Sequence, residues 1–366
     1  METIKTYSFP RAGLLGNPSD GYFGKTLSFA FSDFGVELTL TESARLCFVP
    51  GEVDDATFAS PDDLVRDLRL YGYYGGIRLL KAVSKRFFEY CIKHDIALPK
   101  RNFTASYKIN IPRLVGLSGS SAICTAMLKA LMRFYEVTIP LEYQPTICLE
   151  AEKEELRINC GFQDRVIQIY NGLVFMDFNK SFVEAHNHGI YERLDPAPFS
   201  ISTSSLHLYI AYDAQRAEES GEAHKEVKRL FEAKNSDVLA AMSEFADIAQ
   251  KGRDLLVAGQ LECGVGVGER SRRFADLINA NFDLRDRIFH VAEENRRMVM
   301  TARSVGASAK FAGSGGAIVG TYEDGAQFAA LVHALGTIGC KTFRPTIATS
   351  DEAPEIRSAA ANWRNS

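Results

Sequence analysis

Three serines and two glycines stand directly before an apolar helix pattern, in the segment Pro112-Arg-Leu-Val-Gly-Leu-Ser-Gly-Ser-Ser-Ala122. Alternating residues that end at Ile111 predict a half-buried strand before this segment, and apolar residues at helical spacing up to Phe134 predict a helix after it. Glycine lets the backbone come close to a ligand, serine adds a hydroxyl, and the unpaired N–H groups that begin a helix attract an anion. This pattern favours a site for the phosphates of ATP.

Other interpretations of the glycine-rich segments stay open at this stage. The Gly/Ser segment alone could be a flexible turn, although a turn has no need of three serines before an apolar helix. Phe23-Gly-Lys-Thr26 matches the end of the GxxxxGK[ST] phosphate-binding loop, but the first glycine of that pattern would fall on Ser19. Gly313-Ser-Gly-Gly316, by itself, is ordinary turn chemistry. We therefore place the phosphate site at the Gly/Ser segment.

Two acidic residues downstream are candidates for catalysis. Glu152 and Asp164 lie at the two ends of Glu152-Lys-Glu-Glu-Leu-Arg-Ile-Asn-Cys-Gly-Phe-Gln-Asp164. Carboxylate oxygens suit a Mg²⁺ ion that bridges phosphates, and a carboxylate can also orient a hydroxyl group. The structural alternatives are a solvated helix face for Glu152, a surface ion pair for Arg11 and a simple turn for Asp20. Residue type alone does not decide between these.

The composition favours a soluble enzyme over a nucleic-acid-binding or membrane protein. The chain has 366 residues, 46% hydrophobic and 24% charged, with a net charge of −4, so neither nucleic acid nor an acidic membrane is an expected partner. It lacks a signal-peptide pattern and an apolar run near the roughly 20 residues that cross a bilayer. Seven scattered cysteines without a CxxC pair indicate reduced core thiols and no zinc. We expect a cytoplasmic protein.

The order of the predicted elements indicates an α+β fold with two domains. A polar, turn-rich stretch that ends in Asp195-Pro-Ala-Pro198 is the predicted boundary, which gives an N-terminal domain of residues 1–195 and a C-terminal domain of residues 196–366. We interpret Gly264–Gly268 as a linker. Strands are expected at 27–31, 36–40, 172–178 and 206–212, and helices from Ser60, at 77–91, 143–156, 216–233, 236–257, 270–280, 285–304 and 324–335.

Three of these segments together resemble the motifs of the GHMP kinase superfamily. They are Pro10-Arg-Ala-Gly-Leu-Leu-Gly-Asn-Pro-Ser-Asp-Gly-Tyr-Phe-Gly-Lys25, the Gly/Ser segment and Gly313–Gly316, in the same order and spacing. Within the superfamily the chain is most similar to plant-type glucuronokinases, through Ile111–Ala122, Gly161–Gln168 and Gly172–Phe178. The resemblance covers most of the chain. It implies an N-terminal ribosomal-S5-like domain and a C-terminal ferredoxin-like domain, with ATP and sugar between them.

The resemblance also implies a role for each motif residue. ATP would be held by Gly116, Leu117, Ser118, Gly119, Ser120, Ser121 and Ala122 together with Gly313, Ser314 and Gly315. Mg²⁺ would bind the Ser121 hydroxyl and the Glu152 carboxylate. Asp164 would act on the attacking hydroxyl as general base or orienting group, Arg11 would hold Asp164 ionised, and both would contact the substrate alongside Asp20.

The activity that the resemblance implies is transfer of phosphate from ATP to D-glucuronate, giving D-glucuronate 1-phosphate and ADP. A sibling sugar 1-kinase that uses galacturonate, galactose or arabinose is an alternative, and a non-catalytic sugar or nucleotide sensor is another. A uronate needs a cationic partner for its carboxylate. Lys25 and Arg113 are candidates for that partner because they lie near the motifs. The partners are thus a small-molecule sugar acid and ATP, and the oligomeric state is not indicated.

Overall fold

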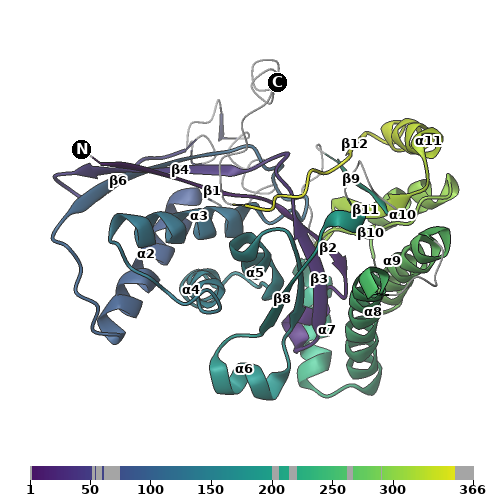
Figure 1. Ribbon diagram of the computed structural model, residues 1–366, viewed down its shortest axis with the longest axis horizontal. Coiled ribbons are helices and arrows are strands. Elements are labelled where there is room, and N and C mark those ends of the chain that lie inside the picture. Colours follow the sequence, from purple (N-terminus) through teal and green to yellow (C-terminus); the bar gives the residue numbers. More distant parts are fainter. Residues whose placement is uncertain are drawn as a thin grey trace.

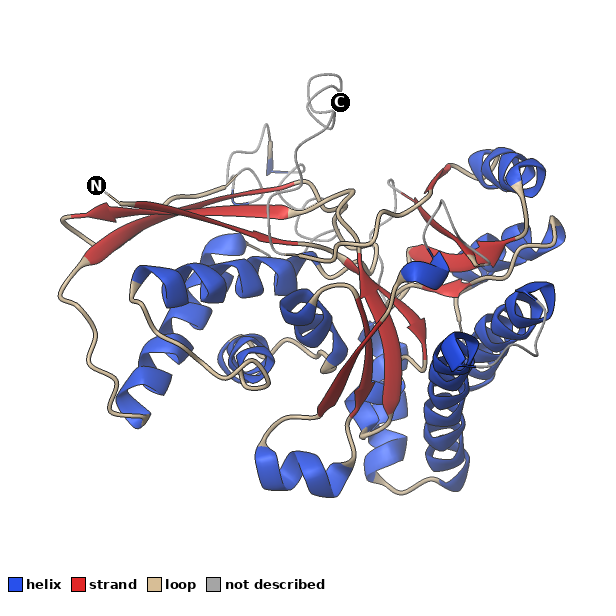
Figure 2. Cartoon of the chain, viewed as in Figure 1, coloured by secondary structure: helices blue, strands red, loops and turns tan. Residues whose placement is uncertain are grey.

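The part of the chain that the structure describes contains three four-stranded sheets with helices packed against them (Figures 1 and 2). The structure is a computed structural model, and it describes residues 2–51, 54, 60–61, 75–199, 206–213, 221–261, 267–289 and 291–350. Within these ranges strands and helices alternate in mixed order, so the predicted α+β class is confirmed.

The first sheet, in the order β1-β4-β6-β5, is covered on one face by two packed helices (Figure 1). Its residues alternate between buried and exposed, as in Val36, Leu38 and Leu40, which are all buried. Apolar side chains of the helices fill the space below, and α3 is buried along most of its length. The elements are β1 (Thr3–Ser8), β4 (Val36–Ser43), β6 (Asn102–Ile109), β5 (Cys47–Phe48), α2 (Gly76–Lys93) and α3 (Gly119–Phe134).

The second sheet, in the order β2-β3-β7-β8, stands at an angle to the first and carries the short turn η1 between β2 and β3. β3 pairs antiparallel with both β2 and β7, and is buried along most of its length because helices cover it. The elements are β2 (Arg11–Leu15), η1 (Ser19–Tyr22), β3 (Lys25–Ala30), α4 (Gln144–Glu150), a π-helical turn (Ala151–Glu155), α5 (Gln163–Tyr170), β7 (Leu173–Asp177), α6 (Lys180–His186) and β8 (Ile190–Leu194).

The third sheet, in the order β10-β11-β9-β12, comes from the last part of the chain and lies among its helices (Figure 2). All three neighbouring pairs are antiparallel. The elements are η4 (Ala197–Phe199), β9 (His207–Asp213), α7 (Gly221–Glu232), α8 (Ser236–Leu261), α9 (Val267–Phe289), α10 (Glu293–Ser304), β10 (Lys310–Phe311), β11 (Ala317–Tyr322), α11 (Gly325–Gly336) and β12 (Cys340–Phe343).

Several predicted boundaries differ from the structure. The break predicted between helices at 280 and 285 is wrong, because α9 continues to Phe289 with neither glycine nor proline to end it. The helix predicted over 143–156 is α-helical only to Glu150 and then widens into the π-helical turn. β8 lies within the stretch from His186 to Pro198 that was predicted to be turn-rich, and α6 ends at the start of that stretch. Residues 62 and 63 of the predicted helix start and residues 264–266 of the predicted linker fall outside the described residues, whereas Val267 and Gly268 belong to α9. The domain division after residue 195 stays a prediction.

Two further sequence expectations concern cysteines and membranes. The cysteines for which the structure gives a state are free thiols, and four of them are buried. Cys47 is exposed and Cys160 is partly buried, so the expectation that every cysteine is a core residue is wrong. None of the helices in the described part of the chain is both long and apolar enough to cross a membrane.

An aromatic cluster joins the second sheet to the third. Phe31, at the end of β3, is fully buried and lies 5.9 Å from the ring of Phe343 in β12. Phe34 contacts the same Phe343 edge-on and Tyr212 of β9 at 6.0 Å. Backbone hydrogen bonds continue this junction, because the Ala348 N–H donates to the Ala30 carbonyl at 2.9 Å. The chain's first and last described segments therefore share one core.

We predict that Phe31→Ala lowers the free energy of unfolding by about 3–5 kcal/mol, because it leaves a cavity where three aromatic rings meet. Denaturant unfolding followed by circular dichroism measures the loss. Ile92→Ala is the control, since that side chain is 76% exposed and its truncation should change stability by about 0.5 kcal/mol or less. Equal losses in the two variants would show that the cluster does not hold the sheets together.

Candidate functional site

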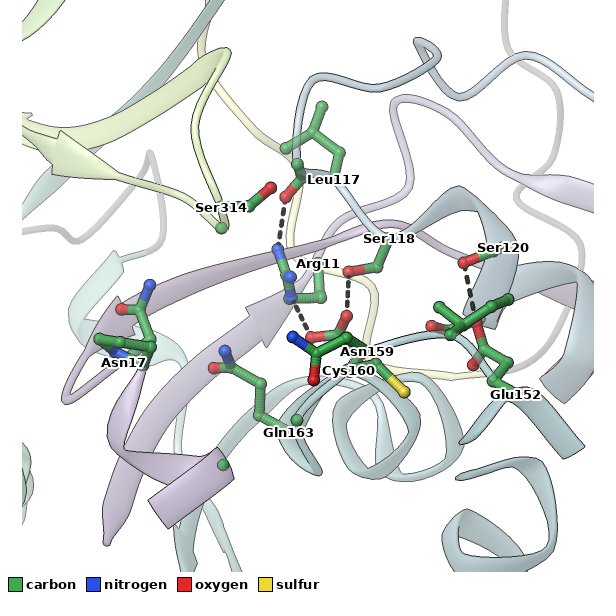
Figure 3. Close-up of a pocket in the computed structure, with 18 of the residues that line it drawn as sticks. Arg11, Asn17, Leu117, Ser118, Ser120, Glu152, Asn159, Cys160, Gln163 and Ser314 are labelled. Atoms are coloured by element: carbon green, nitrogen blue, oxygen red, sulfur yellow. Dashed lines mark hydrogen bonds and ion pairs between the residues drawn. The ribbon is translucent and has the colours of Figure 1, made fainter. Parts of the chain in front are cut away.

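A cavity of about 510 Å³ lies where the three glycine-containing segments meet. Its wall includes residues from η1, from the loop before α3, from the first turn of α5 and from the turn between β10 and β11 (Figure 3). Of the predicted site residues, the cavity wall contains Arg11, Asp20, Gly116, Leu117, Ser118, Gly119, Ser120, Ser121, Glu152, Asp164, Gly313 and Ser314. Segments that are more than 100 residues apart in the sequence thus line one cavity.

The loop before α3 is shaped as an anion site. Ser118 precedes the helix in a left-handed conformation, with φ of 64°, and α3 begins at Gly119 with its first N–H groups toward the cavity wall. The buried body of α3 fixes this end in place. The Ala122 N–H donates to the Ser118 carbonyl at 3.1 Å and Ala122 does not line the cavity. The amides that remain for a ligand are those of Gly119, Ser120 and Ser121.

The turn between β10 and β11 packs directly on that loop. A Cβ at Gly313 would lie 2.1 Å from the Gly116 carbonyl oxygen and 2.8 Å from Nη1 of Arg11, so only glycine fits. Gly315 lies behind the turn, where its carbonyl approaches Gly116, and it does not line the cavity. Ser314 does line it. The close approach explains why both segments need glycine.

Asp164 lies in the first turn of α5 with both oxygens engaged. Nε of Arg11 donates to Oδ1 at 2.7 Å, and the Ser118 hydroxyl donates to Oδ2 at 2.7 Å (Figure 3). Burial raises the pKa of this carboxyl, but the charges of Arg11 and Arg165 and the two hydrogen bonds outweigh burial and lower it. Asp164 is therefore ionised at neutral pH and can accept a hydrogen bond from a substrate hydroxyl.

Asp20 lies in η1 and is 3% exposed. Its Oδ2 accepts the Gln163 N–H at 3.1 Å, and a Cβ at Gly161 would lie 2.0 Å from the same oxygen. Burial and the nearby Asp164 charge raise the pKa of Asp20 from 3.8 to about 6. Two adjacent carboxyls thus have opposite pKa shifts, because Arg11 donates a hydrogen bond to Asp164 whereas only its charge reaches Asp20.

Glu152 lies in the π-helical turn, fully buried. The Ser120 hydroxyl donates to Oε1 at 2.8 Å, and Nε of Arg165 donates to Oε2 at 2.6 Å. Arg165 is itself 1% exposed, and its Nη1 lies 3.9 Å from Oδ2 of Asp164. The guanidinium therefore stands between the two carboxylates that the sequence singled out.

Three buried polar residues in or next to the cavity wall were not predicted: Arg285 lines the cavity, and Asn281 and Lys310 do not. Asn281 and Arg285 lie one turn apart on α9, and each holds a different motif. Asn281 accepts the Gly16 N–H at 2.6 Å, and Arg285 donates to the Gly313 carbonyl at 2.7 Å. Their signal in the sequence is a polar pair in the same helical stripe as Phe274 and Ile278, which are fully buried.

Lys310 is the third of these buried residues, 1% exposed in β10. Its Nζ donates to the Gly13 carbonyl at 2.6 Å, to Oδ1 of Asn17 at 2.5 Å and to the Phe311 carbonyl at 2.8 Å. Burial and the charges of Arg285 and Arg11 lower its pKa. Three acceptors nevertheless require three N–H groups, so the geometry indicates the protonated form. Lys310 fastens β10 to the first motif.

Comparison with known proteins identifies a matching family and two relatives of this chain. The model for the GHMP kinases N terminal domain matches residues 78–172. Glucuronokinase 1 from Arabidopsis thaliana is 42% identical over 323 residues, covering 86% of this chain and 84% of that protein, and Probable glucuronokinase 2 from the same plant is 42% identical over 319 residues. This chain belongs to the GHMP kinase family. It is a kinase, which transfers a phosphoryl group to a hydroxyl group, and its phosphate donor is ATP.

The fold of solved GHMP kinases agrees with that assignment. The crystal structure of Lactococcus lactis galactokinase complexed with galactose has a TM-score of 0.69 to this chain at 14% identity, and covers 96% of this chain and 95% of its own. At that identity the likeness concerns the fold alone. The cavity described above lies among the three segments whose order and spacing predicted a GHMP kinase.

The raised pKa of Asp20 predicts a pH-dependent stability effect in this GHMP kinase. Because the folded state holds the Asp20 proton more tightly than the unfolded chain, ionisation costs stability as pH rises from about 4 through about 6. Asp20→Asn should therefore stabilise the protein by about 1–3 kcal/mol at pH 8, and the gain should shrink toward pH 4. Thermal unfolding across this pH range measures the difference.

Asp247→Asn serves as the control for that experiment, since Asp247 is exposed on α8. Its effect should be small and independent of pH. A gain for Asp20→Asn that stays constant between pH 4 and pH 8 would contradict the raised pKa.

Proposed function

We propose that this GHMP kinase is a glucuronokinase, which phosphorylates the anomeric hydroxyl of D-glucuronate at the expense of ATP. The observation that carries the proposal is the similarity to Arabidopsis glucuronokinases along most of both chains. The paired Asp164 and Arg11 beside the amides that begin α3 support it, because phosphoryl transfer needs a held hydroxyl next to a held phosphate.

In the proposed reaction Asp164 positions the attacking hydroxyl. The sugar oxygen forms a bond to the γ-phosphorus while the bond from that phosphorus to the bridging oxygen breaks, and ADP leaves with the electron pair. The hydroxyl proton passes toward Asp164 late in the step. Since the pKa of Asp164 is lowered, this carboxylate is a weak base, and its main contribution is orientation of the hydroxyl. Arg11 offsets negative charge on the transferred group.

Mg²⁺ is the metal that we propose for this site, and two donors in the cavity fit it. The Ser121 hydroxyl is buried without a hydrogen-bond partner among the described residues, and Glu152, whose carboxylate oxygens accept hydrogen bonds from Ser120 and Arg165, lies in the same wall. No group of three or more His, Cys, Asp or Glu residues suited to a metal occurs in the described part of the chain. Bound Mg²⁺ would neutralise phosphate charge, with ATP oxygens and water as its other ligands.

ADP release in the presence of ATP and Mg²⁺ tests the proposed function. Glucuronate, galacturonate, glucose, galactose and arabinose should be compared, and the highest kcat/KM is expected with glucuronate. Preference for another sugar would keep the kinase and exclude the uronate assignment. Saturable sugar binding without ADP release would instead indicate a sensor.

Asp164→Asn should lower kcat by roughly 100-fold or more and leave ATP affinity nearly unchanged, because the neutral amide orients the hydroxyl less well and cannot accept its proton. Steady-state kinetics with glucuronate and nucleotide titration measure the two effects. Asp177→Asn is the matched control, since Asp177 pairs with Lys25 at 3.2 Å and does not line the cavity. An unchanged kcat in Asp164→Asn would remove this residue from the mechanism.

Ser121→Ala and Glu152→Gln should each raise the Mg²⁺ concentration that gives half the maximal rate, by about 10-fold for the loss of one polar ligand. Ser121→Ala leaves no buried charge unpaired, whereas Glu152→Gln removes the carboxylate that pairs with Arg165. The unfolding temperature should therefore be measured for both variants. Glu155→Gln is the control, because Glu155 lies in the same turn but pairs with Lys85 outside the cavity. An unaltered Mg²⁺ response in both variants would place the metal elsewhere.

A further inference from the structure

The cavity wall contains more cationic side chains than the proposed phosphoryl transfer uses. Three of its arginines are already engaged: Arg11 with Asp164, Arg165 with Glu152, and Arg285 with the carbonyls of the Gly313–Ser314 turn. Lys25, one of the two cations that the sequence suggested for a substrate carboxylate, is not in the wall and contacts Asp177 and Gln250. The other cations in the wall are Lys153, which lies 5.8 Å from the centre of the Phe162 ring, and Arg113, Lys225 and Lys228.

Two lysines of α7 line the cavity. Lys225 and Lys228 lie three residues apart, so both are on one face of the helix, and both are exposed. Neither forms an ion pair with a residue that the structure describes. Glu226, the acid between them, is held by Arg229 at 2.7 Å. The two ammonium groups can therefore receive an anion from the cavity.

The packing of α7 places these lysines at the sugar end of the cavity. The Phe231 ring meets the Tyr22 ring edge-on at 4.9 Å, and Tyr22 belongs to η1, the turn that also carries Asp20. Val227, between the two lysines, is buried and anchors the helix. Figure 1 shows α7 next to the purple turn η1, away from the first sheet that α3 covers. Arg113, by contrast, comes from the loop that leads into the phosphate site.

A uronate needs its carboxylate and its reacting hydroxyl to be bound at different ends of the cavity. The reacting hydroxyl is on C1 and must lie against Asp164, whereas the carboxylate is on C5, across the ring oxygen. Placed near Asp164 or Asp20 the carboxylate would be repelled, since both are acids and Asp20 is buried. We propose that Lys225 and Lys228 bind the substrate carboxylate and thereby select uronates over neutral hexoses. The proposal rests on the proposed function and extends it to substrate choice.

Kinetics with D-glucuronate and D-glucose on matched variants test the proposal. In Lys225→Met/Lys228→Met the KM for glucuronate should rise by about 10- to 100-fold, the range for lost hydrogen bonds to a charged group. The kcat for glucuronate, the KM for ATP and the kcat/KM for glucose should stay within about 3-fold. Lys225→Arg/Lys228→Arg should recover most of the glucuronate affinity, because the positive charge is kept.

Lys251→Met on α8 is the control for removing an exposed lysine, and Arg113→Met tests the remaining candidate from the sequence. Equal losses for glucose and glucuronate in the α7 variants would show a general role and overturn the proposal, as would an unchanged KM for glucuronate. A selective loss in Arg113→Met alone would move the carboxylate site to the phosphate loop. Wild-type enzyme that neither binds glucuronate in calorimetry nor phosphorylates it would overturn the proposed function first, and this proposal with it.

Discussion

The guanidinium of Arg11 is the contact on which the rest of the site depends. From β2 it donates to Asp164 of α5, to the Gly116 carbonyl of the phosphate loop and to the Ala312 carbonyl before the Gly313 turn. One rigid, planar group with several donors in a fixed geometry satisfies three segments at once. The glycines at 116 and 313 follow from this, because the segments that share Arg11 must approach each other at van der Waals distance. The same contact keeps Asp164 ionised, so assembly of the site and its reactivity have one cause.

Two of the three acids in the cavity wall are paired with arginines, and the third is informative. Asp164 has Arg11, and Glu152 has Arg165, so each of these acids can be buried as an anion. Asp20 receives a backbone N–H from Gln163 in place of a guanidinium hydrogen bond, and its pKa rises accordingly. An acid in that state can accept or donate a hydrogen bond to a sugar hydroxyl near pH 6. Its ionisation above that pH is a stability cost that the fold tolerates at a position proposed to contact the substrate.

The sequence was most informative where local chemistry and element order agree. The strand–Gly/Ser loop–helix pattern at Ile111–Phe134 predicted both α3 and its place at the cavity, since glycine, serine and apolar spacing all act over a few residues. Arg165 was overlooked although it adjoins Asp164, because an arginine in a helix reads as exposed until its buried partner Glu152 is seen. Asn281 and Arg285 escaped for a similar reason. The partner of Asn281 is Gly16, more than 200 residues away, and the partner of Arg285 is Gly313, in the turn between β10 and β11. No periodicity in the sequence encodes such contacts.

The division of labour between the two ends of the cavity follows from how each is built. The end of the cavity proposed for phosphate is built from the backbone at the start of α3 and from side chains held in buried hydrogen-bond networks, so a substitution there disturbs several segments together. α7 packs on α8 and α9 and is anchored by Val227 and the Phe231–Tyr22 contact, while its lysines extend from solvent-exposed positions. A lysine on such a face can be exchanged without leaving a buried group unpaired. Selectivity for the acceptor can thus vary on α7 while the phosphoryl-transfer machinery, bound together through Arg11, stays constant.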